Sequence, residues 1–229
     1  MVKEDRAIRL FGKKVFVAFI DILGFKDAIK YDEVHGIDHQ NTIFTLWENA
    51  FIPQRQKLIS HQENILNFAQ FSDCIVFYGT DPVRLVDLVC DFYGWVFAWG
   101  VPVRGGLGYG RIYHSDSLGS LGSAIMLNGS GLIDAYSTEQ SGKGLGMRLF
   151  ASESFVKETK DIFYQTLDNG KVEVPWWFWS GHNYEYFIRR SSDWWKKKNV
   201  GKWFTGTHRE DTKIVFETAV KDLKTQSIS

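Results

Sequence analysis

The feature that most constrains the fold is an unbroken apolar run, Val15–Ile20 (VFVAFI), which is followed at once by Asp21. A short continuous apolar run of this kind predicts a strand that is buried on both faces. An unpaired carboxylate at the end of such a strand would cost several kcal/mol. We therefore expect a cation, a group of hydrogen-bond donors or the protein surface to compensate Asp21. Beyond it the chain turns through Gly24 towards a predicted helix.

The composition excludes several classes of function. The chain has 229 residues and is 44% hydrophobic, which suits one large domain or a domain with an appendage. Lys plus Arg equals Asp plus Glu, at 27 each, so we expect no direct binding to nucleic acid or membrane. The charged start and the lack of any apolar run of transmembrane length predict a cytoplasmic protein, with Cys74 and Cys90 reduced.

The pattern downstream of Asp21 predicts alternating helices and strands. We expect a helix at 25–30, a helix at about 38–60, strands at 64–71 and 74–79, a helix from Asp81, a glycine-bearing strand at 101–114, a helix around 131–140, a strand at 147–151 and a helix from Ser152. The strands at 64–71 and 74–79 form a hairpin with Asp73 at its bend. This order (βααββαβ) is typical of an α+β ferredoxin-like palm core, in which helices cover one face of an antiparallel-rich sheet.

The chain changes in character near residue 160. We expect the palm core to span residues 1–160, and residues 161–229 to add strands and a terminal helix at 209–224 to the same body. Six of the nine tryptophans lie in this second part. Clusters of this kind are more often core or interface than platforms for stacking bases, so a packing role is the expected one.

Two carboxylates, Asp21 and Asp73, are predicted at one edge of the sheet, because the first strand of a palm lies beside the hairpin. Carboxylates a few Å apart repel one another unless a divalent cation lies between them. Sites rich in oxygen suit Mg²⁺ or Mn²⁺ bound together with a substrate phosphate. The alternative is that Asp21 caps the following helix and Asp73 is only a turn residue.

Four segments together resemble a known family of enzymes: FIDILGF, FSDCIVFYG, VRGGLGYG and GSGLIDAYSTEQ. They are similar, in order and spacing, to the core blocks of class III nucleotidyl cyclases, and most similar to the Pycsar pyrimidine cyclases of bacterial anti-phage defence. The resemblance covers about residues 15–157. It implies the class III cyclase catalytic fold, a homodimer with its sites at the interface, and two Mg²⁺ or Mn²⁺ ions per site.

The resemblance also implies roles for individual residues. Asp21 and Asp73 match the two metal-binding aspartates, and the backbone carbonyl of Ile22 matches the third metal ligand of the protein. The turn Leu23–Gly24–Phe25 matches the turn whose N–H groups hold the triphosphate, and a glycine turn that enters a helix favours phosphate in any case. Arg104 matches an arginine on the polyphosphate, for which its planar fork is suited. Without the family, a surface charge on an edge strand is an equally good reading of Arg104.

Some positions depart from the purine cyclases of the class. Where those enzymes read adenine with a lysine, this chain has Asn67, whose amide could present a donor and an acceptor to uracil or cytosine. Where they carry an asparagine and then an arginine on the helix, this chain has Ile133 and Ser137. The cation that steadies the transition state is therefore unassigned, and ATP is an unexpected substrate.

The implied activity is the conversion of UTP to 3′,5′-cyclic UMP and pyrophosphate, as a second messenger that a separate effector protein reads. Cyclisation of CTP to cyclic CMP is the alternative within enzymes. A catalytically silent, nucleotide-binding dimeric sensor is the alternative from another class. Other sites are poorly supported: His35 and His39 lack a third zinc ligand, and the glycines around Lys143 match neither a Walker loop nor a dinucleotide fingerprint.

Overall fold

The computed structural model describes residues 12–35, 66–98, 101–119, 122–179 and 207–226. The helix expected at about 38–60, His39 and the three tryptophans beyond residue 180 lie outside the described residues.

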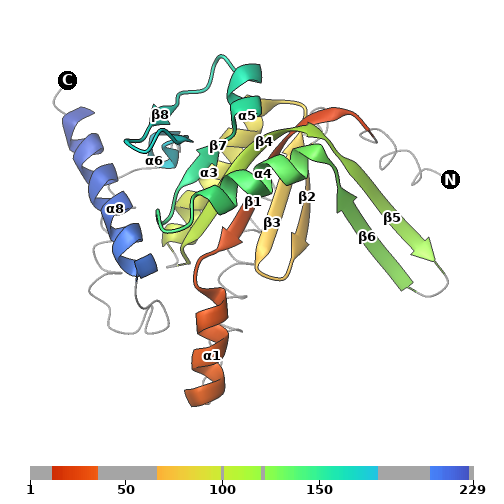
Figure 1. Ribbon diagram of the computed structural model, residues 1–229, viewed down its shortest axis with the longest axis horizontal. Coiled ribbons are helices and arrows are strands. Elements are labelled where there is room, and N and C mark those ends of the chain that lie inside the picture. Colours follow the sequence, from red (N-terminus) through yellow and green to blue (C-terminus); the bar gives the residue numbers. More distant parts are fainter. Residues whose placement is uncertain (1–11, 36–65, 99–100, 120–121, 180–206, 227–229) are drawn as a thin grey trace.

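A seven-stranded mixed sheet forms the centre of the protein (Figure 1), in the order β2-β3-β1-β4-β7-β9-β8. Only the β4–β7 pair is parallel within this sheet. The strands are β1 (Lys14–Ile22), β2 (Leu66–Phe71), β3 (Cys74–Gly79), β4 (Val103–Arg111), β7 (Leu149–Ala151), β8 (Gln165–Thr166) and β9 (Val172–Glu173). The predicted buried strand is confirmed as β1, and the predicted hairpin as β2–β3, which pairs with β1 through β3.

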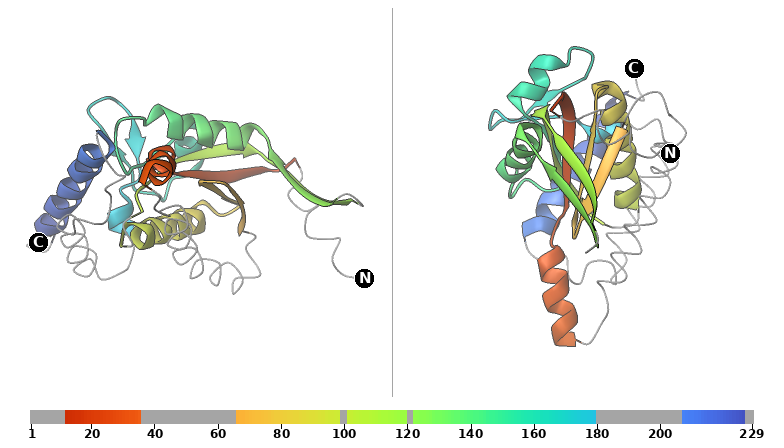
Figure 2. Two further views of the ribbon diagram at one scale, coloured as in Figure 1. Left: turned by 90° about the horizontal axis from the view of Figure 1, so that it is seen from below. Right: turned by 90° about the vertical axis from the view of Figure 1, so that its right-hand side faces the viewer.

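Helices cover both faces of this sheet, as the left view of Figure 2 shows. Successive residues of β1 face opposite sides of the sheet. Phe16, Ala18 and Ile20 belong to the core cluster that also contains the apolar side chains of α3 (Pro82–Ala98). Val15 and Val17 pack on the opposite side with Ala135 of α4 (Ser130–Ser141). The expectation that helices cover one face is wrong, because β1 alternates apolar residues on both sides and each side needs a cover.

The helices that were predicted from Asp81 and from Ser152 both begin where expected. The carboxylate of Asp81 accepts hydrogen bonds from the backbone N–H groups of Val83 and Arg84, at 3.0 and 3.1 Å, and Pro82 takes the first position of α3. Ser152 likewise caps the short helix α5 (Glu153–Glu158) by accepting from the N–H of Phe155.

Alternate glycines in β4 bring the backbone of α4 into direct contact with the sheet. A Cβ atom added to Gly106 would lie 2.1 Å from the carbonyl oxygen of Ala135, and one added to Gly108 would lie 2.5 Å from the nitrogen of Ala135. Gly110 faces the nitrogen of Gly131 in the same way, at 2.6 Å. The glycine-bearing strand was expected to admit a backbone or a ligand, and the backbone of α4 occupies this position.

A two-stranded arm extends from the body of the protein (Figure 1) and was not expected. It consists of β5 (Tyr113–Gly119) and β6 (Gly122–Asn128), paired antiparallel. The single strand predicted at 101–114 is wrong at its end, because the ladder of β4 stops at Arg111 and β5 starts a separate sheet.

The C-terminal part joins the same sheet and the same core. The strand β9 pairs with β7, and the large core cluster includes Trp176 and Trp177 of α6 (Trp176–Trp179) together with Val215 and Ala219 of α8 (Thr207–Gln226). A packing role is thus confirmed for these two tryptophans. Among the described helices, none combines the length and the apolar character that crossing a bilayer requires.

Candidate functional site

The structure brings Asp21 and Asp73 together at one end of the sheet. Asp21 of β1 lies opposite Cys74, the residue after Asp73, in the β1–β3 ladder. The backbone N–H of Ile22 donates to the carbonyl oxygen of Asp73 at 3.0 Å, which fixes the hairpin bend beside the end of β1. Asp21, Ile22 and Asp73, the three residues predicted to hold metal, are therefore neighbours in space.

The bend that carries Asp73 is a two-residue turn, Ser72–Asp73, between β2 and β3. Ser72 has a φ of 50°, in the left-handed region that a residue other than glycine seldom adopts. The Cys74 thiol donates to the carbonyl oxygen of Phe71 at 3.2 Å and closes the turn. Such a tight turn gives the Asp73 carboxylate a fixed place at the sheet edge.

The Asp21 carboxyl group lies in an environment with an excess of negative charge. Burial raises its pKa from 3.8 to about 7, and the nearby carboxylates of Glu139 and Asp73 add to this rise, while Arg104 and Lys143 oppose it. No hydrogen bond or ion pair with another described residue compensates Asp21, so capping of the following helix is not its role. A bound cation would relieve this unfavourable charge.

The predicted ligand set fits a divalent cation. Two carboxylates and the Ile22 carbonyl are hard oxygen donors, the kind that Mg²⁺ and Mn²⁺ prefer. Within the part of the chain that the structure describes, no three His, Cys, Asp or Glu side chains are grouped as a complete metal site. Two carboxylates and one carbonyl would fill part of a coordination shell, and substrate phosphate and water would fill the rest.

Arg104 is buried in the middle of the sheet, so a surface charge on an edge strand is the wrong reading of this residue. It lies opposite Asp21 in the β1–β4 ladder and is 3% exposed. Its Nε donates to Oε1 of Glu139 at 2.7 Å, and its Nη2 contacts the same oxygen. Its remaining nitrogen, Nη1, is buried and has no hydrogen-bond partner. Arg104 thus keeps an unused donor beside Asp21.

Glu139 is a functional candidate that the sequence reasoning missed. It is fully buried on α4, and its second oxygen accepts from Nε2 of Gln140 at 2.5 Å. It reaches Arg104 because Gly106 leaves the last turn of α4 in contact with β4: a Cβ atom on Gly106 would lie 2.4 Å from the nitrogen of Glu139. The sequence offered one signal for this role: Glu139 comes four residues after Ala135, so the two lie on the same side of the helix, the side that contacts the glycines of β4.

The predicted phosphate turn enters α1 (Phe25–His35) directly after β1. Gly24 has a φ of 77° and its carbonyl oxygen accepts from the N–H of Asp27 at 3.0 Å. The N–H of Leu23, however, donates to the carbonyl oxygen of Pro102 at 3.0 Å. Leu23 would have to release this bond to hold a phosphate, so the turn in this conformation offers fewer donors than expected.

Asn67 lies on the same face of the sheet as Asp21. Asn67 is paired with Tyr78 in the β2–β3 ladder, and Tyr78 is paired with Val17 of β1, so the three side chains lie on one face. Residues an even number of positions apart on a strand share a face, and Val17 and Asp21 of β1 are such a pair. The amide nitrogen of Asn67 is buried without a hydrogen-bond partner. Buried donors without partners are uncommon and call for an explanation, such as a missing ligand or water.

The outer face of α4 carries Ile133 and Ser137, which the resemblance matches to an asparagine and an arginine of the purine cyclases. Ile133 is 65% exposed and the nearby Tyr136 is 47% exposed. The ring of Tyr136 packs edge-on against Phe19, at 5.3 Å between centroids. Tyr136 therefore packs on the face of β1 that also carries Asp21, and Ile133 is exposed on the same helix.

Comparison with known proteins gives matches in structure alone. No family model matches the chain, and no curated protein is similar to it in sequence. A bacterial light-regulated adenylyl cyclase matches with a TM-score of 0.51 at 13% identity, over 81% of this chain and 58% of that chain. The adenylyl cyclase CyaB from P. aeruginosa matches with a TM-score of 0.50 at 15% identity, over 70% of this chain and 91% of that one.

The guanylyl cyclase Cya2 lies slightly lower, with a TM-score of 0.49 at 12% identity over 71% of this chain and 92% of its own. Likeness at such low identity concerns the fold and not the reaction. The chain therefore has the α+β fold of the catalytic domain of class III nucleotidyl cyclases.

Proposed function

We propose that the protein is a nucleotide cyclase that converts UTP to 3′,5′-cyclic UMP and pyrophosphate, as a second messenger in anti-phage defence. The observation that carries the activity is the meeting of Asp21 and Asp73 at one sheet end, where burial and neighbouring carboxylates raise the pKa of Asp21 to about 7. In such surroundings the ionised form of Asp21 is unfavourable by itself, and a cation bound beside it would stabilise that form.

Two buried donors without partners support a ligand on the same face. Nη1 of Arg104 and Nδ2 of Asn67 both lack hydrogen-bond partners, and both residues were expected to contact the nucleotide. An unsatisfied buried donor costs about 1–3 kcal/mol, and a bound ligand that pairs with it recovers this cost. Arg104 would bind the polyphosphate through Nη1, and Asn67 would bind an edge of the base.

In the proposed reaction the ribose 3′-oxygen attacks the α-phosphorus in line. The new O3′–Pα bond forms as the bond from Pα to the bridging oxygen breaks; pyrophosphate leaves with that electron pair, and the 3′-hydroxyl proton passes to solvent. Asp21, Asp73 and the carbonyl of Ile22 would hold two Mg²⁺ or Mn²⁺ ions. Such ions, when bound, stabilise the charge on the attacking and leaving oxygens.

The choice of a pyrimidine rests on Asn67. The short amide would leave a purine poorly paired, so ATP and GTP should be poor substrates. An amide can flip to match either uracil or cytosine, so Asn67 alone does not separate UTP from CTP. UTP is preferred here by the resemblance to Pycsar cyclases, and cyclisation of CTP is the alternative.

The protein is proposed to act as a homodimer with its sites at the interface. The exposed side chain of Ile133 on α4 suits such an interface, because a partner subunit would remove it from water. Ile133→Glu should therefore shift the protein towards monomer in size-exclusion chromatography with light scattering. An unchanged dimer would place the interface elsewhere.

Incubation with each of the four nucleoside triphosphates and Mn²⁺, followed by mass spectrometry, tests the activity. Cyclic UMP as the main product supports the proposal, cyclic CMP supports the alternative, and efficient cyclic AMP formation contradicts the pyrimidine assignment. Asn67→Ala should lower both the rate and the preference for pyrimidines. Metal-dependent UTP binding without release of pyrophosphate would instead indicate a catalytically silent sensor.

A further inference from the structure

The segment 142–148, which follows α4, is fixed over the strand that carries Arg104. At its start, the N–H of Gly142 donates to the carbonyl oxygen of Glu139 at 2.9 Å, and Glu139 is paired with Arg104. At its end, the carbonyl oxygen of Arg148 accepts from the N–H of Gly105 at 3.0 Å. The start of the segment is therefore tied to Arg104 through Glu139, and its end is tied directly to Gly105. Both ties lie at the end of the sheet that carries Asp21.

The backbone around Lys143 is ordered while its side chain is exposed. Gly142 is buried against the ring of Phe150, since an added Cβ atom would lie 2.0 Å from a ring carbon, and the N–H of Lys143 donates to the carbonyl oxygen of Gln140 at 3.3 Å. An added Cβ atom on Gly144 would meet nothing within 4 Å, so the rim beside Lys143 is open. The Lys143 side chain makes no ion pair with any described residue.

Lys143 lies beside the buried pair that faces Asp21. It directly follows Gly142, whose N–H is bonded to Glu139, and Glu139 is paired with Arg104, which lies opposite Asp21. The charge of Arg104 is already balanced by the buried carboxylate of Glu139. Lys143 therefore brings to this end of the sheet a positive charge that makes no ion pair within the described chain.

We propose that Lys143 binds the terminal phosphates of the nucleoside triphosphate and stabilises the leaving pyrophosphate. This inference rests on the proposed function, and it gives the site a cation from its own chain. An ammonium group on a long, flexible stem suits the terminal phosphates, which lie furthest from the buried base and carry much of the charge. Arg104, which is rigid and buried, would bind nearer to the α-phosphate.

Titration calorimetry with Mn²⁺ and a non-cyclisable uridine triphosphate analogue, with uridine monophosphate as the second ligand, tests this role. Lys143→Ala should weaken binding of the triphosphate roughly tenfold, the loss expected for one charge-assisted contact, and leave binding of the monophosphate unchanged. Lys143→Arg should keep most of the affinity, because the positive charge remains. In turnover, Lys143→Ala should lower kcat as well as raise KM, since charge on pyrophosphate grows as it leaves.

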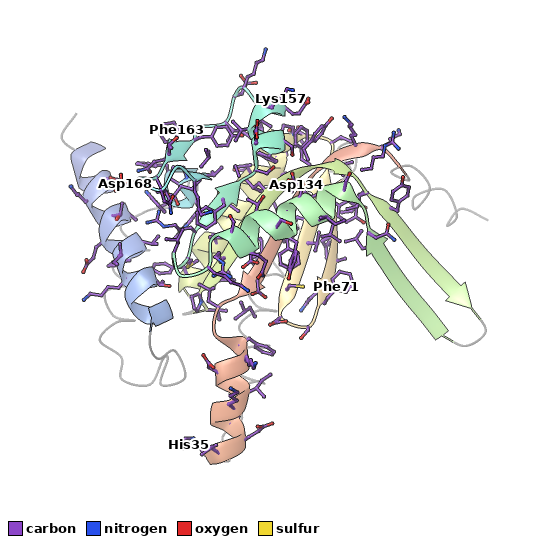
Figure 3. All side chains as sticks on the ribbon, in the orientation of Figure 1. His35, Phe71, Asp134, Lys157, Phe163 and Asp168 are labelled. Carbon is purple, nitrogen blue, oxygen red and sulfur yellow. The ribbon has the colours of Figure 1, made fainter. Side chains whose placement is uncertain are left out.

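Lys157→Ala is the matched control: Lys157 is another exposed lysine, on α5 (Figure 3). The ring of Phe155 of that helix packs on Phe16, five residues before Asp21 and roughly 17 Å along the strand. This variant should bind both ligands as the unaltered protein does. Equal binding of the triphosphate by Lys143→Ala and the unaltered protein would overturn the role of Lys143, even if cyclic UMP is formed.

The two proposals fail in different ways. Triphosphate binding that depends on Lys143, without a cyclic product from any of the four nucleotides, would support Lys143 and overturn the proposed activity. Loss of mono- and triphosphate binding to the same extent in Lys143→Ala would also overturn the role of Lys143, because a general disturbance of the site does not distinguish the two ligands. Failure of the unaltered protein to bind either ligand would overturn both proposals.

Discussion

Replacement of Glu139 by leucine should destabilise the protein strongly, because it leaves a buried cation without its partner. Glu139 is fully buried, Arg104 is 3% exposed, and the two are joined through Nε and Nη2 of the guanidinium. Removing one partner of a buried pair costs about 3–5 kcal/mol. For a chain of this length, a change of 1 kcal/mol shifts Tm by about 2–4 °C, so the expected fall in Tm is roughly 6–20 °C.

The double variant Arg104→Met with Glu139→Leu separates the cost of an unpaired charge from the value of the pair. Apolar residues of similar volume often replace a buried ion pair without loss of stability, so the double variant should be more stable than either single variant. Urea denaturation in the absence of divalent cations measures all four proteins. Additive losses in the double variant, or a loss below about 1 kcal/mol for Glu139→Leu, would refute the assignment of a buried ion pair.

Three further predictions concern the site and the helix that covers it. Asp73→Asn should reduce cyclisation at least 100-fold, by analogy with the loss of one transition-state contact, and leave the circular dichroism spectrum unchanged; a rate within threefold of the original contradicts a metal-binding role. Because the pKa of Asp21 is about 7 in the folded chain against an ordinary 3.8, the folded state holds a proton that the unfolded state releases. The metal-free protein should thus lose stability as pH rises from about 4 to 7, and Asp21→Asn should lack this part of the slope in urea titrations. Gly108→Ala should cost about 1–3 kcal/mol or more, since its Cβ atom would lie 2.5 Å from a backbone nitrogen, whereas Gly170→Ala meets open space and should cost only its backbone strain; similar melting temperatures for the two would contradict the close contact.

Much of the fold could be predicted because patterns of neighbouring residues determine it. The apolar run of β1, the two-residue turn before Cys74 and the Asp81–Pro82 helix start each depend on adjacent residues. The arm β5–β6 could not be predicted in the same way. Among the described strands its two strands pair only with each other, so the arm is no continuation of the seven-stranded sheet whose buried core produces the apolar pattern.

The part of the site formed by strand ends could be predicted, whereas the part formed by the contact between a helix and a distant strand could not. Asp21 and Asp73 follow from the strand and the hairpin, and the structure places them together. The Arg104–Glu139 pair joins residues 35 positions apart and depends on how closely α4 approaches β4. The alternating glycines of β4 indicated a close approach, but not which helix would make it or which side chain would be carried to Arg104.

The way in which the C-terminal part enters the sheet has a consequence for biosynthesis. Val174, Trp177 and Val215 lie in the same core cluster as Ile20 of β1, so residues that are made later complete the packing of residues that are made earlier. While the chain is growing on the ribosome, the apolar side of β1 and α3 has no finished cover. Until α8 has been made, such a nascent chain exposes apolar surface, and its core is closed only by contacts between residues far apart in the sequence. Truncation before α8 should therefore yield aggregates or chaperone-bound fragments, not a smaller folded domain.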